Sequence, residues 1–347
     1  MPSSLELLQC PYLRDLLDQP AAMERTVTGF SPVGELGRLR EDLRAGRFAR
    51  VVLTGMGGSY HMLYPLHLRL TQAGFNSVLA ETSELLDSLA TLLTKDTLVI
   101  ALSQSGASAE TVRLLDRGGP TIVGVTNTPE SPLAQKADVT VLTRAGEEGG
   151  VACKTAVTSL AALEWLSADL AGDDLGRARA ELETAAPVLE TYLVNWKRHV
   201  QTLAGILKGI EHAFVVGRGR SLAAAGLGGM IQKEAAHVHG EGMSSAAFRH
   251  GPFEMLGPDC FVLVMEGDAE VAAKNRQLVD DVVATGARGA LCGLQDSDGP
   301  FALPQAPERI RPILELLPPQ MMSLAFAYLK GREPGKFERI TKVTTVE

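Results

Sequence analysis

Short apolar runs alternate with segments of helical periodicity along most of this chain, and that alternation restricts its fold more than any other feature. The clearest run, 97–102, is short and rich in β-branched residues, and it leads into apolar positions that recur at helical spacing. Strands that alternate with helices in short units build a parallel, doubly wound α/β sheet. The strands expected in the first sheet are 51–54, 77–80, 97–102, 121–125 and 139–142.

The second half of the chain repeats this pattern. The run 212–216 leads into a second glycine-containing loop, and the runs 261–265 and 289–294 follow at matching distances. The repeat indicates a tandem duplication of one α/β unit. We therefore expect two three-layer α/β/α domains, with this division of the chain: an N-terminal helical segment at 1–33, a first domain at 34–172, linking helices at 173–208, a second domain at 209–330 and a C-terminal tail at 331–347.

Three serines follow the strand expected at 97–102: Ser103, Ser105 and Ser108. They precede a predicted helix, and the free N–H groups and the dipole at a helix N-terminus favour an anion. Helix capping alone needs one hydroxyl, whereas this loop offers three, together with Gln104 and a glycine. The sequence therefore predicts a phosphate-binding loop at the carboxyl end of the first sheet.

The second copy has carboxylates where the first has serines. Glu266 and Asp268 follow the run 261–265, and their charges would repel a phosphate. We therefore expect the first copy alone to bind the anion, which leaves the second copy free to supply chemistry. Arg218 and Arg220 are expected to shape the second glycine loop and not to bind substrate.

Composition and charge narrow the function classes. The 347 residues carry a formal net charge of −8, which gives no general attraction to nucleic acid, and no basic run gives a local one. The chain's start lacks the regions of a signal peptide, and no apolar run reaches membrane-spanning length, so we expect a soluble, cytoplasmic protein. The cysteines lie far apart, at Cys10, Cys153, Cys260 and Cys292, so neither a zinc site nor a disulfide framework is indicated. We expect no metal and no cofactor.

Six ordered segments carry a resemblance to a known family. They are 57–60, 103–111, 148–152, 233–241, 249–252 and 342–347. Together they resemble the tandem SIS (sugar isomerase) domains of the isomerase half of glucosamine-6-phosphate synthase and of stand-alone phosphosugar isomerases and deaminases. The similarity runs from about Tyr12 to the C-terminus. It implies two tandem SIS domains, a sugar 6-phosphate substrate and a homodimer whose active site is shared between subunits.

The resemblance also implies roles for single residues. Glu234 matches the base that moves a proton between C1 and C2. His250 matches a ring-opening histidine that reaches in from the partner subunit, and Lys342 matches a lysine that contacts the sugar end of the substrate. A loop containing Val151 closes over the sugar. Substrate and phosphate binding are expected at Gly58, Ser59, Ser103, Gln104, Ser105, Ser108, Val151 and Cys153.

Elementary chemistry fits these assignments. Proton transfer between adjacent carbons of an α-hydroxy or α-amino carbonyl needs a base that returns the proton, and a carboxylate can do this. Without the resemblance, each residue has a simpler interpretation: Glu234 is an exposed helix carboxylate, His250 a turn residue and Lys342 a solvated tail residue. His239 and Glu241 are expected to have structural or interface roles and not to bind metal.

Departures from the synthase pattern leave the substituent at C2 open. Ile231 stands where the synthase has a second lysine, and Cys153 where it has a serine. Met1 begins directly at the isomerase-like region, so glutamine-dependent synthesis by this chain alone is not expected. We predict an enzyme that interconverts a ketose 6-phosphate with an aldose or 2-amino-aldose 6-phosphate. The alternatives are a non-catalytic sugar-phosphate-binding regulator and a fructosamine-6-phosphate deglycase.

Overall fold

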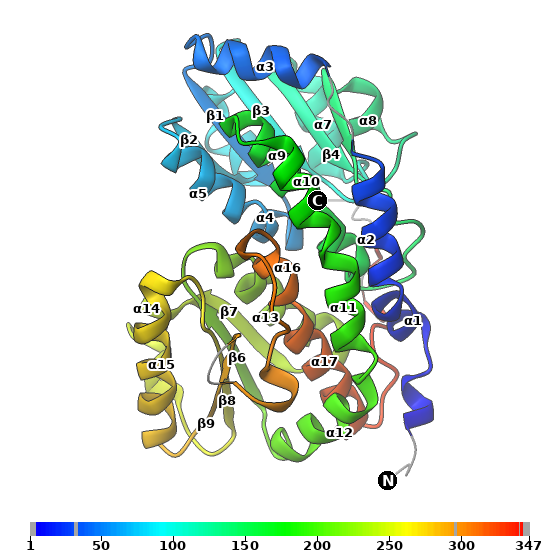
Figure 1. Cartoon of the computed structure of the whole chain (residues 1–347), viewed down its shortest axis with the longest axis vertical. Coiled ribbons are helices and arrows are strands. Elements are labelled where there is room, and N and C mark those ends of the chain that lie inside the picture. Colours follow the sequence, from blue (N-terminus) through cyan, green and yellow to red (C-terminus); the bar gives the residue numbers. More distant parts are fainter. Residues whose placement is uncertain (1–4, 31–33, 295–296, 340, 343–347) are drawn as a thin grey trace. The chain divides into compact units, whose positions relative to one another are not determined.

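The first sheet contains five parallel strands in the order β2-β1-β3-β4-β5. The computed structural model describes all residues except 1–4, 31–33, 295–296, 340 and 343–347, and it contains each strand expected for this sheet (Figure 1). The central strand is buried along its whole length, which accounts for its uninterrupted apolar sequence. The strands are β1 (Arg50–Gly55), β2 (Ser77–Glu81), β3 (Thr97–Leu102), β4 (Thr121–Thr126) and β5 (Val139–Leu142).

Helices cover both faces of this sheet. One face forms a core with α6 (Thr82–Asp87), α7 (Ala109–Arg117) and α8 (Pro132–Lys136). The other face is covered by α5 (Tyr64–Gln72) and α9 (Lys154–Ala171), which contact one another, and α3 (Gly34–Arg44) also contacts α9 (Figure 1). The segment between β1 and β2 forms two helices, α4 (Gly58–Met62) and α5, because Pro65 lies in the first turn of α5 and ends the helix before it.

The second sheet contains four parallel strands in the order β7-β6-β8-β9. Three of them, β6 (His212–Gly217), β8 (Cys260–Met265) and β9 (Arg288–Cys292), lie where apolar runs predicted them. The fourth, β7 (His239–Ser244), was not predicted. Its sequence, His-Gly-Glu-Gly-Met-Ser, lacks β-branched residues and contains two glycines, which is unusual for a strand. The α/β fold with parallel sheets is thus confirmed.

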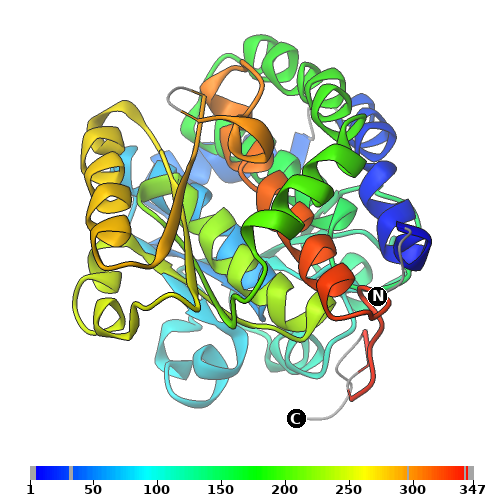
Figure 2. The ribbon, with the colours of Figure 1, turned by 90° about the horizontal axis from the view of Figure 1, so that it is seen from below.

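Helices also cover both faces of the second sheet. Residues of α14 (Ser245–Phe248) and α15 (Ala269–Ala284) form a core with one face. On the other face, α13 (Leu222–Ala236) contacts β6 and β7, and α17 (Leu317–Leu329) packs on α13 (Figure 2). The short helix α16 (Arg311–Leu314) precedes α17, and α12 (Trp196–Ile206) contacts α17.

Four further helices complete the α-helical part of the described chain: α1 (Pro11–Leu17), α2 (Gln19–Thr28), α10 (Leu175–Glu183) and α11 (Ala185–Leu193). Pro11 and Pro20 each lie in the first turn of one of the two short N-terminal helices, α1 and α2, where the missing N–H costs nothing. No helix within the described part of the chain has the length and apolar character that crossing a membrane requires.

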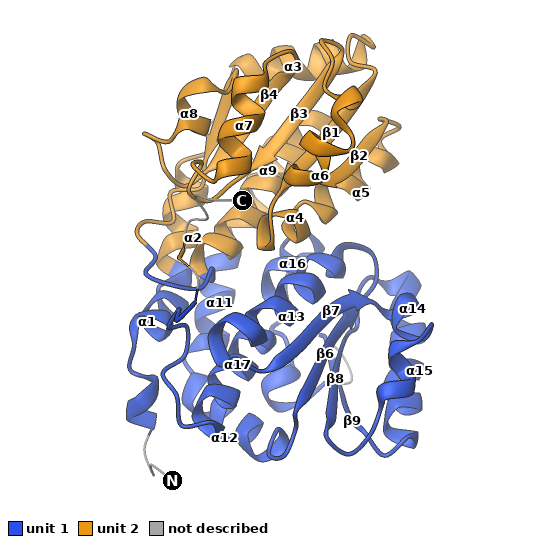
Figure 3. Ribbon diagram, turned by 180° about the vertical axis from the view of Figure 1, so that it is seen from behind, with its two compact units in different colours: residues 1–20, 148–153, 185–339 blue, residues 21–147, 154–184, 340–347 orange. Residues whose placement is uncertain are grey.

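The chain divides into two units (Figure 3). Unit 1 comprises 1–20, 148–153 and 185–339, and contains the second sheet. Unit 2 comprises 21–147, 154–184 and 340–347, and contains the first sheet. Unit 1 therefore includes α1 and the loop 148–153, which are distant in sequence from its sheet.

Candidate active site

The serine loop (103–108) of unit 2 is held by the segment that follows the neighbouring strand β4. The carbonyl oxygen of Gln104 accepts hydrogen bonds from Asn127 N (3.0 Å) and Thr126 Oγ1 (3.1 Å). The loop turns at Gly106, where φ is +62° and the side chain of Ser131 packs against the glycine. A β-carbon added to Gly106 would lie 2.7 Å from Ser131 Cβ. Glycine is therefore required at this turn.

The serine hydroxyls are already oriented by backbone donors. Ser103 Oγ accepts from Gly106 N (3.1 Å), and Ser105 Oγ accepts from Ala107 N (3.3 Å). Ser108 caps α7 by accepting from Thr111 N (3.4 Å). Because Ser103 Oγ and Ser105 Oγ accept a hydrogen bond, their own O–H groups remain available as donors.

Backbone N–H groups add to these donors. No described residue accepts a hydrogen bond from the N–H of Gln104, Ser105 or Ser108. These groups lie at or just before the N-terminus of α7, where the helix dipole also favours negative charge. The serine loop thus has the hydroxyls, the free amides and the helix that an anion site requires.

A second loop lies at the same end of this sheet. It follows β1, which pairs in parallel with β3 in the register Thr54 with Ala101, so the segments after both strands leave the same edge. The loop turns at Gly57, with φ +53°, and leads into Gly58 and Ser59 at the start of α4. Both residues are half-buried.

In unit 1, Glu234 lies near the C-terminal end of α13 and is half-buried. Burial raises the pKa of its carboxyl group, and the nearby Lys233 opposes this shift. Among the residues that the structure describes, none forms a hydrogen bond or an ion pair with this carboxylate. A partly buried carboxylate without a partner and with a raised pKa is suited to accept and return a proton.

The loop 148–153 is closed on itself and tied to α1. Glu148 accepts a hydrogen bond from Cys153 N (2.9 Å), and the thiol of Cys153 also donates to this carboxylate (3.5 Å). Gly149 N donates to Asp15 Oδ2 on α1 (2.9 Å). Val151 and Cys153 are fully buried in this arrangement.

The segment after α17 connects this loop with α13. Gly335 N donates to Ala235 O at the end of α13 (3.0 Å), next to Glu234. The carbonyl oxygen of Gly335 lies close to Gly150. A β-carbon added to Gly150 would be 3.0 Å from that oxygen. Glycine at position 150 is therefore needed for the close approach of the two backbones.

Tyr12 is a buried residue of this region that sequence reasoning missed. Its hydroxyl lies 3.1 Å from Ser323 Oγ, which donates to a backbone carbonyl, so Tyr12 acts as the donor. Its pKa is raised well above the usual value by burial and then by the charges of Cys153, Glu234 and Glu148, against the opposing effect of the Ser323 hydrogen bond. These groups thus lie within electrostatic range of one hydroxyl. Glu148 begins the segment 148–152, which carries part of the family resemblance, but the sequence did not single it out as a site residue.

His250 and Lys342 are the other two residues expected to be catalytic, one in each unit. His250 is exposed, in the turn between α14 and the 3₁₀ helix Pro252–Met255, where its N–H donates to Ala247 O (2.9 Å). Lys342 is half-buried and belongs to unit 2. The rest of the C-terminal motif, 343–347, lies outside the described residues.

The structure gives no sign of a metal site in the part of the chain that it describes, since no three His, Cys, Asp or Glu side chains there could hold an ion together. His239 and Glu241 lie on β7, with Nε2 and Oε1 3.7 Å apart.

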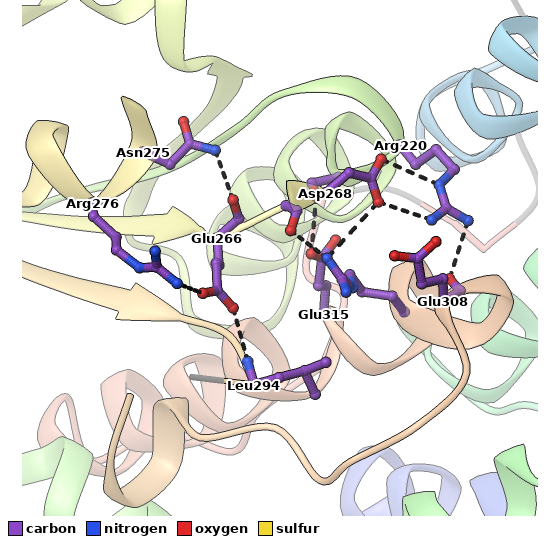
Figure 4. Close-up of polar contacts among 11 residues, drawn as sticks. Arg220, Glu266, Asp268, Asn275, Arg276, Leu294, Glu308 and Glu315 are labelled. Atoms are coloured by element: carbon purple, nitrogen blue, oxygen red, sulfur yellow. Dashed lines mark hydrogen bonds and ion pairs between the residues drawn. The ribbon is translucent and has the colours of Figure 1, made fainter. Parts of the chain in front are cut away.

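Ion pairs lie at the corresponding end of the second sheet (Figure 4). Asp268 pairs with Arg220 (2.8 Å) and lies 3.8 Å from Arg311. Glu266 pairs with Arg276 and accepts from the N–H of Leu294 (3.0 Å). The carboxylates that would repel a phosphate are thus neutralised inside the protein. Arg220 shapes this loop, as the sequence predicted.

Glu315 is buried beside these ion pairs, where Ser221 Oγ donates to it (2.9 Å). Burial raises its pKa from the usual 4.5 to about 7. The native state therefore holds this proton more tightly than the unfolded chain does. This contribution to stability is complete below pH 4.5 and is lost as the pH rises through about 7.

We expect Glu315→Gln to stabilise the protein at pH 8 by up to about 3 kcal/mol, because an amide carries no charge to bury. Urea unfolding at pH 5 and pH 8 measures the effect, and the difference from the wild type should shrink at the lower pH. Glu308→Gln, at an exposed position of the same segment, is the matched control and should change neither value. Equal pH dependence in Glu315→Gln and the wild type would contradict the raised pKa.

Comparison with known families connects the first sheet to a named domain. Residues 47–168 match the model of the SIS domain, so this part of the chain is a SIS domain. It contains the serine loop and the Gly58–Ser59 loop. The resemblance to the SIS family inferred from the sequence is confirmed.

Relatives of known name match almost the whole chain. The glutamine–fructose-6-phosphate aminotransferase (isomerizing) of Pyrococcus horikoshii is 30% identical over 351 residues, which cover 96% of this chain and 57% of the relative. The enzyme of the same name from Bacillus spizizenii is 28% identical, again over 96% of this chain and 58% of the relative. This chain thus spans less than two thirds of the length of the relatives it matches.

Solved structures show the same fold. The C-terminal domain of glucosamine-fructose-6-phosphate aminotransferase from Francisella tularensis superimposes with a TM-score of 0.82 at 20% identity, covering 94% of this chain and 98% of that one. A Silicibacter pomeroyi protein whose name assigns it to the phosphosugar isomerases has a TM-score of 0.78 at 27% identity, covering 93% of this chain and 99% of that one.

Proposed function

We propose that this chain, which carries a SIS domain over residues 47–168, is a sugar-phosphate isomerase. It interconverts a ketose 6-phosphate with an aldose or 2-amino-aldose 6-phosphate. The observation that carries the proposal is Glu234, a half-buried carboxylate with a raised pKa and no hydrogen-bonding partner among the described residues. Such a group is suited to moving a proton between C1 and C2 of the open-chain sugar. The Silicibacter pomeroyi relative, named for phosphosugar isomerases, supports the same class.

We assign the phosphate of the substrate to unit 2. The proposed donors are the hydroxyls and free amides of the serine loop, with Gly58 and Ser59 from the neighbouring loop. Charge-assisted hydrogen bonds to a phosphate are strong, and a phosphate fixed far from the reacting carbons can orient them. Val151 and Cys153 are proposed to contact the sugar, and Lys342 to lie at its reacting end.

We further propose that the second sheet is a second SIS domain, with the domains at 34–172 and 209–330. The parallel strand order of the second sheet supports this, since β7-β6-β8-β9 repeats the order β2-β1-β3-β4. The active protein is proposed to be a homodimer in which His250 acts in the partner's site. Its exposed position is what such a role requires.

The proposal leaves the substituent at C2 open, and one assay identifies it. The purified protein is incubated with fructose 6-phosphate plus ammonium and, separately, with glucosamine 6-phosphate. Fructose 6-phosphate, glucose 6-phosphate, glucosamine 6-phosphate and ammonia are followed together. We expect interconversion of a ketose and an aldose 6-phosphate, and consumption or release of ammonia would identify an amino group at C2.

A result without turnover would contradict the enzyme and favour one alternative. If neither sugar phosphate is converted but either one raises the melting temperature, the chain is a sugar-phosphate-binding protein. Release of a free amino acid from a fructosamine 6-phosphate adduct would instead indicate a deglycase.

A further inference from the structure

A basic hollow that contains none of the residues assigned above lies in unit 1. It has a volume of about 380 Å³ and is lined by Arg218, Arg249, Ala273, Lys274 and Gln277. Arg218 comes from the loop after β6, Arg249 from the end of α14, and the other three from α15. The hollow therefore gathers three cations from three elements of a protein whose net charge is −8.

Arg218 differs from the other arginines of this strand end. Arg220 and Arg276 pair with Asp268 and Glu266, whereas the side chain of Arg218 has no hydrogen-bonding or charged partner among the residues that the structure describes. Its Nε is buried and unpaired, as is that of Arg276, but Arg276 has an ion pair through its terminal nitrogen. Burying a guanidinium N–H without an acceptor is costly. The sequence-based expectation that Arg218 shapes the loop is therefore incomplete.

Lys274 and Arg249 add two positive charges to the hollow, and only one of them is paired with a carboxylate. Lys274 is exposed and also pairs with no described residue. Arg249 pairs with Asp281, which also accepts from Gln277. With one carboxylate for three cations, the hollow keeps an excess of two positive charges. A dianion matches that excess.

We propose that this hollow binds the phosphate group of a small molecule, as a phosphomonoester or a diphosphate, at a site separate from the serine loop. The guanidinium groups of Arg218 and Arg249 can each present two parallel N–H donors to phosphate oxygens, and Lys274 adds a third charge. The volume is in the range of sites for small ligands.

The position of the hollow in the fold favours a ligand. β6 and β8 are adjacent, and the helices that follow them, α13 and α15, cover opposite faces of the sheet (Figure 2). Ligands of doubly wound sheets bind at such a point, beyond the carboxyl ends of the strands. Arg218 also lies on the loop that leads into α13, the helix that carries Glu234.

The test measures binding of inorganic phosphate and of pyrophosphate by titration calorimetry in phosphate-free buffer. The first probe represents a phosphomonoester, and the second a diphosphate. The variants are Lys274→Gln and Arg218→Gln, with Lys208→Gln as the control that removes an exposed lysine elsewhere in unit 1. A Ser105→Ala/Ser108→Ala variant removes two of the hydroxyl donors of the proposed serine-loop site and should weaken that site.

We expect the serine-loop variant to retain tight binding of at least one probe. In that background, Lys274→Gln should weaken binding roughly tenfold or more, and Arg218→Gln further, whereas Lys208→Gln should have no effect. Equal binding by Lys274→Gln and Lys208→Gln would overturn the proposal, and so would loss of all binding in the serine-loop variant. Because Lys274 is exposed, its variant keeps the test valid even if Arg218→Gln fails to fold.

Discussion

Replacing Glu234 by glutamine is expected to lower turnover by roughly a hundred- to ten-thousandfold, because the amide cannot accept the proton that moves between C1 and C2. Binding of the sugar phosphate should change little, since the proposed phosphate donors lie in unit 2. Calorimetry gives the binding constant. The carbon proton itself is followed by NMR in deuterated water, where Glu234→Gln should show almost no exchange of hydrogen for deuterium.

The matched control is Glu190→Gln, the same chemical change at an exposed position of α11 in the same unit. It should leave turnover and exchange as in the wild type. The pH dependence gives a second check: the activity should rise with pH through a pKa above the usual value for glutamate, because burial disfavours the charged base. Wild-type exchange in Glu234→Gln would exclude this residue as the base.

Local sequence was sufficient to predict the strands of the first sheet, but it did not predict the strand β7 of the second. The central strands β3 and β8 are buried on both faces, so their sequences are continuously apolar and easily identified. The strand β7 carries glycines where a strand usually has branched residues. The glycines of β7 are needed because the helix α13 packs closely on this strand. That requirement comes from another element, so it leaves no periodic apolar pattern in the sequence of β7.

The candidate site also has one part that could be predicted from local sequence and one part that could not. The serine loop could be predicted because its strand, its hydroxyls and its helix are consecutive in sequence. The surroundings of Glu234 could not, because they depend on contacts between distant segments. Tyr12 and Ser323 are 311 positions apart, and Asp15 holds a loop 134 positions away. The difference between Arg220, which is paired, and Arg218, which is not, also arises only in the folded chain.

Replacing Gly242 by alanine is expected to lower the free energy of unfolding by more than about 3 kcal/mol, because the added methyl group has no space. A β-carbon on this residue of β7 would lie 2.6 Å from Cα of Gly226 on α13, and closer still to the carbonyl oxygen of Ala225. These are backbone atoms, so relief requires α13 to move away from the sheet. Urea unfolding should show a lower midpoint, and α13 would carry Glu234 with it, so activity should fall as well.

Gly205→Ala is the matched control, because it makes the same substitution within α12 of the same unit, where nothing lies within 4 Å of the new β-carbon. Alanine is the better helix former, so this variant should gain about 0.5–1 kcal/mol. The two variants are thus expected to differ in sign. If Gly242→Ala were as stable as Gly205→Ala, α13 and β7 could not be in backbone contact. The glycines of β7 would then need another explanation than the close approach of the helix that carries the proposed base.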